Sequence, residues 1–236
     1  MNLVVNFRPL NLSINANSKV LFIYPHPDDE TYANGALIQR LTMNKVSTKC
    51  VCLTKGGAST LQYGIVGNNL EEIRQKEFIS VMKYLNVSDY EILDLEDNNL
   101  TQNTNLAEII KAQISSYSPT HVITYEPMGI YGHKDHIIVS KAVFDLQKDY
   151  KFVLLYSTVS PNYKPDKDSL AMAENPENIK PIKRNLVLYL TPVEIIEKLK
   201  ALSLYKSQVS IKHNFIHNLV HVVYLAREYY YKKDLV

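Results

Sequence analysis

The chain has 236 residues, 46% of them hydrophobic, and its 26 Lys and Arg residues nearly balance 24 Asp and Glu residues, for a formal net charge of +2. This length and apolar content suit one α/β domain with a substantial core, and the charge balance argues against nucleic acid as the main partner. The apolar runs are far shorter than the roughly 20 residues of a membrane-spanning helix.

Strand and helix patterns alternate along the chain as far as residue 156. The apolar runs of β type predict strands at 20–24, 46–53, 90–95, 121–125 and 151–156. Between them, apolar residues at helical spacing predict helices at 30–44, 70–85, 106–117 and 136–146. A segment rich in glycine and polar residues, 53–69, has the length of a functional loop.

The C-terminal part of the chain is less regular. Residues 157–184 are polar and contain prolines, which predicts an irregular excursion, and 185–190 predicts a late strand. Thr191 followed by Pro192 and Glu194 has the pattern of a helix start, and we expect this helix to run to about residue 207. A last helical or mixed segment follows, and we expect the tyrosines of its REYYYKK stretch to pack on the domain.

The alternating pattern predicts an α/β fold with a Rossmann-like, mostly parallel sheet and helices on both faces, in a single domain that spans residues 1–236. Ligands of such sheets bind beyond the carboxyl ends of the strands. Two polar clusters, YPHPDDE at 24–30 and GIYGHKDH at 129–136, each lie just after a predicted strand. We therefore expect the two clusters to meet at one edge of the sheet.

These clusters contain the residue types that a catalytic zinc needs. Zinc takes about three protein ligands and keeps a position open for water. The clusters supply His26, one of the acids Asp28 and Asp29, and one of the histidines His133 and His136. One carboxylate and one imidazole then remain beside the metal.

A hydrolase has a use for both remaining groups. The carboxylate can take a proton from the attacking water, and the imidazole can stabilise the oxyanion or protonate the leaving group. Asp135 suits a group that holds an imidazole in one tautomer. The simpler alternative is that Asp28 or Asp29 caps a helix that begins at Glu30. The second His/Asp cluster, which also follows a strand, weakens this alternative. In addition, two like-charged carboxylates at a sheet edge are easier to explain with a cation present.

PHPDDE followed downstream by GHKDH resembles the LmbE/PIG-L-like family of zinc-dependent N-acetylglucosaminyl de-N-acetylases. The likeness extends to LTKGG, EEIRQKE and LYKSQ, so it covers the chain from about residue 20 to about residue 208. The resemblance implies a Rossmann-like fold, one Zn²⁺ per chain, and hydrolysis of the N-acetyl group of an N-acetylglucosamine-type sugar or conjugate. The products would be acetate and a free amine.

The resemblance also assigns roles to single residues. His26, Asp29 and His136 match the zinc ligands of the family. Asp28 matches its general base, and His133 matches the histidine that assists the oxyanion or the leaving group.

Three more residues match positions of known importance in the family. Asp135 matches the residue that orients an imidazole, Tyr131 takes a place where some members use a tyrosine near the reacting carbonyl, and Arg74 matches an arginine that reaches the substrate. Two residues depart from the family pattern. Lys134 stands where proline is usual, which should lower the rigidity of the loop, and Gly57 stands where an acid often follows the T-x-G loop.

Two other functions fit part of the pattern. A non-catalytic metal- or sugar-binding protein on the same scaffold would need neither Asp28 nor His133. A hydrolase of a different ester or amide is the second, although a two-metal phosphoesterase would want more carboxylate ligands. We therefore expect a small-molecule N-acetylated sugar as the partner. A homo-oligomer is compatible with the sequence, which does not set the oligomeric state.

The remaining candidates carry less chemistry. His213, His217 and His221 are spaced by four and would share one face of a helix, but no carboxylate lies among them, so we expect a polar face there instead of a second metal site. Cys50 and Cys52 lie in one predicted strand and suit a reduced core. The N-terminal segment lacks the basic start and apolar block of a signal peptide. Together these features predict a cytoplasmic protein without a membrane span.

Overall fold

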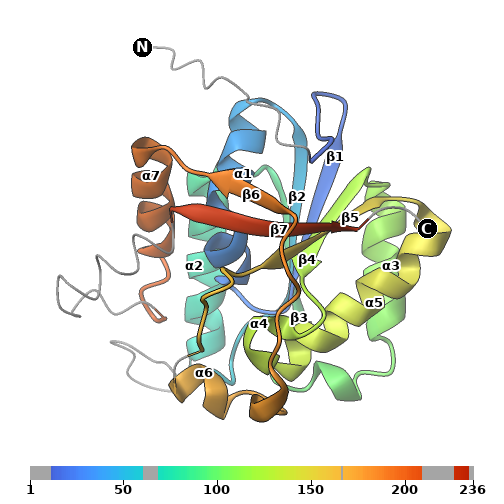
Figure 1. The fold of residues 1–236 in the computed structure, drawn as a ribbon, viewed down its shortest axis with the longest axis vertical. Helices are drawn as coiled ribbons and strands as arrows, with labels where there is room; N and C mark the ends of the chain where they lie inside the picture. The colour runs from blue at the N-terminus through green and yellow to red at the C-terminus, as the bar shows by residue number, and fades with distance from the viewer. Residues whose placement is uncertain (1–11, 61–68, 166, 209–225, 234–236) are drawn as a thin grey trace.

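The computed structural model describes residues 12–60, 69–165, 167–208 and 226–233 (Figure 1). Its strands form one seven-stranded sheet in the order β3-β2-β1-β4-β5-β7-β6. Five strands are parallel: β1 (Lys19–Tyr24), β2 (Ser47–Thr54), β3 (Asp89–Leu95), β4 (His121–Tyr125) and β5 (Val153–Thr158). β6 (Leu186–Tyr189) and β7 (Arg227–Lys233) extend the sheet in antiparallel pairing.

Helices cover both faces of the sheet, as Figure 1 shows. One face packs on α1 (Asp29–Met43), α2 (Leu70–Tyr84) and α7 (Pro192–Leu202). The other face packs on α3 (Leu106–Tyr117) and α5 (Lys134–Tyr150). The short helices are α4 (Gly129–Gly132), α6 (Lys167–Ala171), η1 (Leu100–Gln102) and η2 (Pro176–Asn178). The predicted mostly parallel α/β architecture is therefore confirmed.

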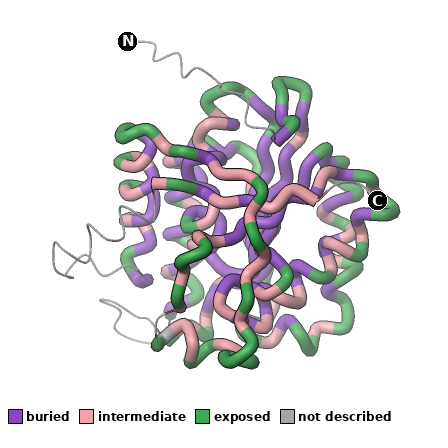
Figure 2. The backbone as a smooth tube through the Cα atoms, viewed as in Figure 1, coloured by how far each residue is buried: buried purple, intermediate pink, exposed green. Residues whose placement is uncertain are grey.

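The alternation of side chains along β1 shows why the sheet is buried on both sides. Phe22 and Tyr24 point into the core under α1 and α2, whereas Leu21 and Ile23 point into the core under α3 and α5. All four side chains are buried, and Figure 2 shows the buried strands inside a more exposed outer layer. Strands with two covered faces need apolar residues at successive positions, which is the pattern that the sequence shows.

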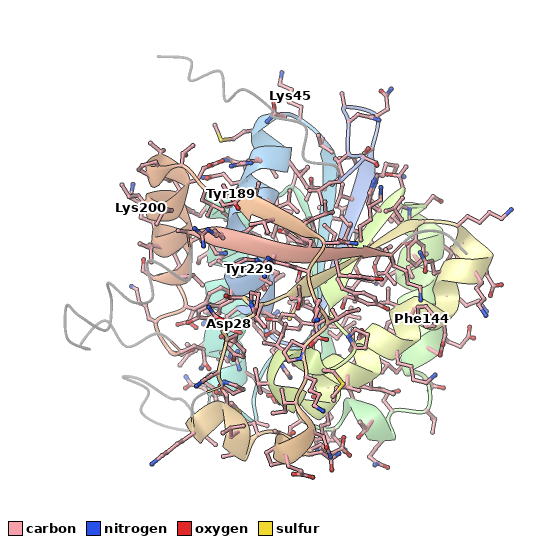
Figure 3. The ribbon with its side chains drawn as sticks, viewed as in Figure 1. Asp28, Lys45, Phe144, Tyr189, Lys200 and Tyr229 are labelled. Carbon is pink, nitrogen blue, oxygen red and sulfur yellow. The ribbon has the colours of Figure 1, made fainter. Side chains whose placement is uncertain are left out.

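The strand order places the candidate site. β1 and β4 are neighbours in the sheet, but their chains continue to opposite faces, α1 on one side and α5 on the other. This is the switch point of a doubly wound sheet, where a crevice opens beyond the carboxyl ends of the strands. In Figure 3, Asp28, which follows β1, lies at the opposite end of the sheet from Lys45, which precedes β2.

Some predicted boundaries are wrong. α5 begins at Lys134 and ends at Tyr150, whereas the prediction was 136–146; His133 caps it by accepting the N–H of Asp135. α7 has the predicted capping box at Thr191 but ends at Leu202, before the predicted end near 207. The predicted excursion contains the short elements α6 and η2.

The C-terminal tail contains a strand that the sequence analysis did not assign. Residues 227–233 form β7, which lies between β5 and β6. Its Glu228 carboxylate is buried and accepts from Lys198 Nζ (2.7 Å) and from the backbone N–H groups of Ala36 and Leu37 (2.9 and 3.0 Å). The tail therefore packs on the domain, as expected, but it does so as an inserted strand.

Candidate active site

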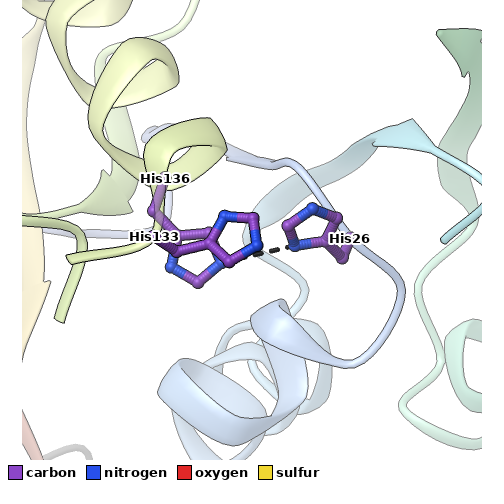
Figure 4. A group of neighbouring side chains, drawn as sticks. All are labelled: His26, His133 and His136. Carbon is purple, nitrogen blue, oxygen red and sulfur yellow. Dashed lines mark hydrogen bonds between the residues drawn. The ribbon is translucent and has the colours of Figure 1, made fainter. Parts of the chain in front are cut away.

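The loops that follow β1 and β4 bring the two polar clusters together. Figure 4 shows His26 facing His133 and His136 across the carboxyl ends of the strands. The ring of His26 lies 4.9 Å from that of His133 and 5.2 Å from that of His136, and all three side chains are buried. The predicted meeting of two segments more than 100 positions apart is thus present in the structure.

Three side-chain atoms have the spacing of ligands around one metal ion. His26 Nδ1 lies 3.2 Å from Asp29 Oδ2 and 3.3 Å from His136 Nε2, and these last two atoms lie 3.5 Å apart. A tetrahedral ion with bonds of about 2.0–2.1 Å separates its ligands by about 3.3 Å. The nitrogen and carboxylate donors also suit zinc, so the residues fit the implied metal.

His133 offers a second arrangement. Its ring nitrogen lies within 4.8 Å of nitrogens of His26 and His136, so three imidazoles could also hold a cation. However, His133 Nδ1 already accepts the N–H of Asp135 (3.2 Å). The group with Asp29, whose ligand atoms lie within 3.5 Å of one another and which adds a carboxylate charge, is the better candidate ligand set.

The electrostatics of these residues reflect burial and close neighbours. Burial lowers the pKa of His136 to about 3 and that of His133 to about 4, so both imidazoles are neutral. Burial opposes ionisation of Asp29, but His136 and His26 outweigh it and hold the pKa of this carboxyl well below its usual range. His26 differs: burial opposes its protonation, but hydrogen bonds to Asp135, Asp29 and Asp97 hold the pKa of this imidazole well above its usual value. Because imidazoles bind metals in the neutral form and carboxylates in the ionised form, a cation would displace a proton from His26 but not from His133 or His136.

Asp28 has an unusual backbone for a non-glycine residue. Its φ of +102° and ψ of −31° lie in the region that favours glycine, just before α1. Burial raises the pKa of its carboxyl to about 8, although the Arg74 guanidinium, whose Nη2 lies 3.5 Å away, opposes this. A strained residue with a basic carboxylate beside candidate metal ligands is typical of a functional position.

Arg74 and Glu30 hold the turn that contains Asp28. Arg74 donates to the carbonyl oxygens of Pro27 (2.6 Å) and Gly56 (2.8 Å), and its side chain is buried. Glu30 accepts the N–H of Asp28 (3.2 Å) and the hydroxyl proton of Tyr205 (2.6 Å). Arg74 thus connects the turn after β1 with the loop after β2. Its contact with substrate stays a prediction.

The loop after β4 is anchored by Glu126, which is fully buried. Its carboxylate accepts the N–H groups of Met128 (3.0 Å), Ile130 (2.8 Å) and Ile182 (3.2 Å). These bonds hold Ile130 at a φ of +67°, which is rare for a β-branched residue. The ring of the next residue, Tyr131, then lies edge-on to His136 at 5.3 Å.

The two departures from the family pattern have different outcomes. Lys134 is the first residue of α5, where the cap from His133 already fixes the start of the helix. A Cβ atom added to Gly57 would lie 2.4 Å from Oε1 of Glu71, on α2. A larger residue at position 57 would therefore displace the Glu71 carboxylate.

Two residues beside the ligand atoms were not found from the sequence. Asp97 Oδ1 lies 3.0 Å from His26 Nε2, whereas Asp135 Oδ2 accepts from the same nitrogen at 3.4 Å. Tyr125 touches two of the candidate ligands, Asp29 and His136. The position of Asp97 just beyond a predicted strand was a signal that could have found it, because ligands bind at that end of the sheet.

The histidines at 213, 217 and 221 lie outside the described residues. Within the part of the chain that is described, no helix has the length and apolar character to cross a membrane.

Known proteins of one family resemble this chain in sequence. Residues 21–146, just over half of the chain, match the PIG-L family, described as GlcNAc-PI de-N-acetylase. A Bacillus anthracis protein named probable N-acetyl-alpha-D-glucosaminyl L-malate deacetylase 2 is 29% identical over 221 residues, which cover 89% of this chain and 86% of the relative. The diacetylchitobiose deacetylase of Thermococcus kodakarensis is 30% identical over 128 residues, or 54% of this chain and 48% of the relative.

Solved structures share the fold. The N,N'-diacetylchitobiose deacetylase from Pyrococcus horikoshii superimposes with a TM-score of 0.68 at 22% identity, over 94% of this chain and 88% of that chain. The zinc-inhibited form of teicoplanin deacetylase superimposes with a TM-score of 0.66 at 15% identity, over 93% of this chain and all of that chain (100%). At these identities the likeness supports the fold alone.

Proposed function

Because the chain belongs to the PIG-L family of de-N-acetylases, we propose that it is a metal-dependent amidohydrolase that removes the acetyl group from an N-acetylglucosamine-type sugar or conjugate. The observation that carries this proposal is the set of three ligand atoms within 3.5 Å of one another, with the Asp28 carboxylate on the neighbouring residue. Relatives named as deacetylases of glucosaminyl malate and diacetylchitobiose support this class of substrate.

His26, Asp29 and His136 would hold the metal, and zinc is the ion that their donor set suits best. A bound zinc ion supplies Lewis acidity and lowers the pKa of a water molecule to about 7. The contacts of each ligand on its other side limit its movement. His136 Nδ1 donates to the carbonyl oxygen of Gly129 (3.2 Å), which leaves Nε2 bare for a metal.

Asp28 is the proposed general base. Its raised pKa makes its carboxylate a better proton acceptor than an ordinary aspartate, and Arg74 stabilises the ionised form. As water adds to the acetyl carbonyl carbon, Asp28 takes the proton. The same proton can pass to the amine when the carbon–nitrogen bond breaks and acetate leaves.

His133 is suited to stabilise the oxyanion. Its Nδ1 accepts the N–H of Asp135, so the single proton of the neutral ring is on Nε2, which can donate to a developing negative charge. The ring of Tyr131 lies 5.8 Å from that of His133, and its hydroxyl is a proposed second donor.

A metal- or sugar-binding protein without catalysis is the rival that must be tested. Such a protein has no need of a strained Asp28 next to Asp29, and backbone strain is costly to keep without a function.

We further propose that the chain forms a single catalytic domain. Its two cysteines are buried and free, which supports the expected reducing compartment, the cytoplasm.

Two variants separate metal binding from chemistry. We expect Asp28→Asn to retain the metal content of the wild type and to lose turnover by about 10²–10⁴-fold, the usual contribution of a general base. We expect His136→Ala to lose the metal. Asp94→Asn, which changes an exposed carboxylate paired with Lys55, is the matched control. An active Asp28→Asn enzyme would show that the base is misassigned.

A further inference from the structure

Tyr125, the last residue of β4, contacts two of the three proposed metal ligands at once. Its hydroxyl donates to Asp29 Oδ1 at 3.1 Å and lies 3.3 Å from the backbone carbonyl oxygen of Asp29. Its ring stacks on the imidazole of His136, with centroids 4.4 Å apart and planes inclined by 26°. The side chain is only 7% exposed, so these contacts are not shared with bulk water.

The two oxygens of Asp29 face different partners. Oδ2 accepts the backbone N–H of His26 (3.0 Å) and lies nearest to His26 Nδ1 and His136 Nε2, whereas Oδ1 accepts from the Tyr125 hydroxyl. These two hydrogen bonds fix the plane of the carboxylate. The tyrosine hydroxyl holds Oδ1 away from the imidazole nitrogens, so Oδ2 is the oxygen that faces a cation bound among them.

The ring of Tyr125 limits His136 in a second way. The hydrogen bond from His136 Nδ1 to the carbonyl oxygen of Gly129 fixes one ring atom, but by itself it does not fix the plane of the ring. The stacked tyrosine ring covers one face of the imidazole and His133 stacks nearby, with centroids 4.7 Å apart and planes inclined by 30°. His136 Nε2 is thus directed toward Asp29 Oδ2 before any ion binds.

We propose that Tyr125 is a positioning residue of the metal centre, which holds Asp29 as a one-oxygen ligand and fixes the ring plane of His136. This inference rests on the proposed function, because it takes Asp29 and His136 as metal ligands. Removal of a partner that orients a metal ligand typically weakens metal binding by about 10–100-fold. Tyr125 itself touches neither the substrate nor the ion in this role.

Tyr24 provides a matched control in the same core. It is the last residue of β1, and its ring packs edge-on against that of Tyr125 with centroids 4.8 Å apart. Its buried hydroxyl bonds to Ser157 Oγ (2.8 Å) and accepts from Asn34 Nδ2 (2.6 Å). Removal of this hydroxyl perturbs the same core through a polar network that holds no proposed metal ligand.

The test measures metal affinity directly. Wild type, Tyr125→Phe and Tyr24→Phe are stripped with a chelator and titrated with Zn²⁺ against a chromophoric competitor. We expect Tyr125→Phe to bind one Zn²⁺ about 10–100-fold more weakly than wild type, and Tyr24→Phe to bind as wild type does. With Co²⁺ as the probe, the visible absorption spectrum should change in Tyr125→Phe alone, because Asp29 is then free to bind through both oxygens.

Several results would overturn the inference. Wild-type affinity in Tyr125→Phe, or an equal loss in Tyr24→Phe, would show that the hydroxyl has no specific role at the metal. Absence of metal binding in the wild type would instead defeat the proposed function. A measurement on protein that retains Tyr125 covers the case of a variant that does not fold. The chain has no tryptophan, and Tyr131→Phe removes the other tyrosine ring placed against His136. A Zn²⁺ titration of Tyr131→Phe should still give a tyrosine difference spectrum in the near ultraviolet, and its absence would contradict the inference.

Discussion

The backbone of Asp28 leads to a prediction about stability that can be tested on inactive variants. At a φ of +102°, a residue with a Cβ atom is strained, whereas glycine is not. Asp28→Gly and Asp28→Ala both remove the carboxylate and its contact with Arg74. The difference in stability between these two variants therefore reports the strain, reduced by the extra freedom of glycine in the unfolded chain, and neither variant should retain activity.

The size of this difference follows from two opposing terms. A residue in such a region costs about 1–3 kcal/mol in the folded state. Relief of this strain stabilises Asp28→Gly, but glycine also loses more conformational entropy on folding than alanine, which costs roughly 0.5–1 kcal/mol. The free energy of unfolding of Asp28→Gly should thus exceed that of Asp28→Ala by about 1 kcal/mol. For a chain of this size that raises the melting temperature by about 2–4 °C.

Urea unfolding and thermal melting of metal-free protein measure the difference. Glu72, an exposed residue in the first turn of α2, is the control position. Because position 72 has ordinary helical backbone angles, Glu72→Gly should be less stable than Glu72→Ala by roughly 1 kcal/mol. Asp28→Gly that is equal to or less stable than Asp28→Ala would refute the claim that this position is strained.

Two further predictions concern the surroundings of the site. Tyr205→Phe removes the buried hydrogen bond to Glu30 (2.6 Å) and should cost about 1.5–3 kcal/mol in the free energy of unfolding. Because Glu30 also accepts the N–H of Asp28, turnover should fall while metal content stays at the wild-type level; unchanged turnover would argue against this link. Burial lowers the pKa of His121 below 6.5, although a hydrogen bond with Leu12 opposes this. The unfolded chain then binds the extra proton, so the free energy of unfolding should fall as the pH drops through 6.5, and fall less in His121→Gln. Urea unfolding between about pH 7 and pH 5 measures both slopes, and equal slopes would contradict the assignment.

Most of the parallel part of the fold could be predicted because β1, β2, β4 and β5 are covered on both faces and are rich in apolar residues, whereas β3 at the edge of the sheet is only half-buried. β7 could not be predicted in this way. Its sequence, REYYYKK, carries charges at both ends, and its Glu228 is buried only because Lys198 and the N–H groups of α1 meet it there. Pairing with β5 and β6, which are distant in the sequence, makes this segment a strand.

The candidate site divides along similar lines. His26, Asp29 and His136 belong to two short motifs that follow strands of a predicted parallel sheet, and the carboxyl ends of such strands share one edge. The choice of Asp29 over Asp28 and of His136 over His133 came from the family resemblance. Asp97 and Tyr125 belong to no such motif. Their contacts depend on which strands are neighbours and on which face each side chain points to, and a single sequence does not set the strand order.

The central claim is that this chain removes acetyl groups with the help of a bound metal. The most direct test is release of acetate from a panel of N-acetylglucosamine conjugates, with and without a chelator, followed by the return of Zn²⁺. We predict release by the wild type, loss on chelation and recovery with Zn²⁺, and no comparable release by Asp28→Asn. Full activity in metal-free protein, or no release from any conjugate by protein that carries its metal, would contradict this account.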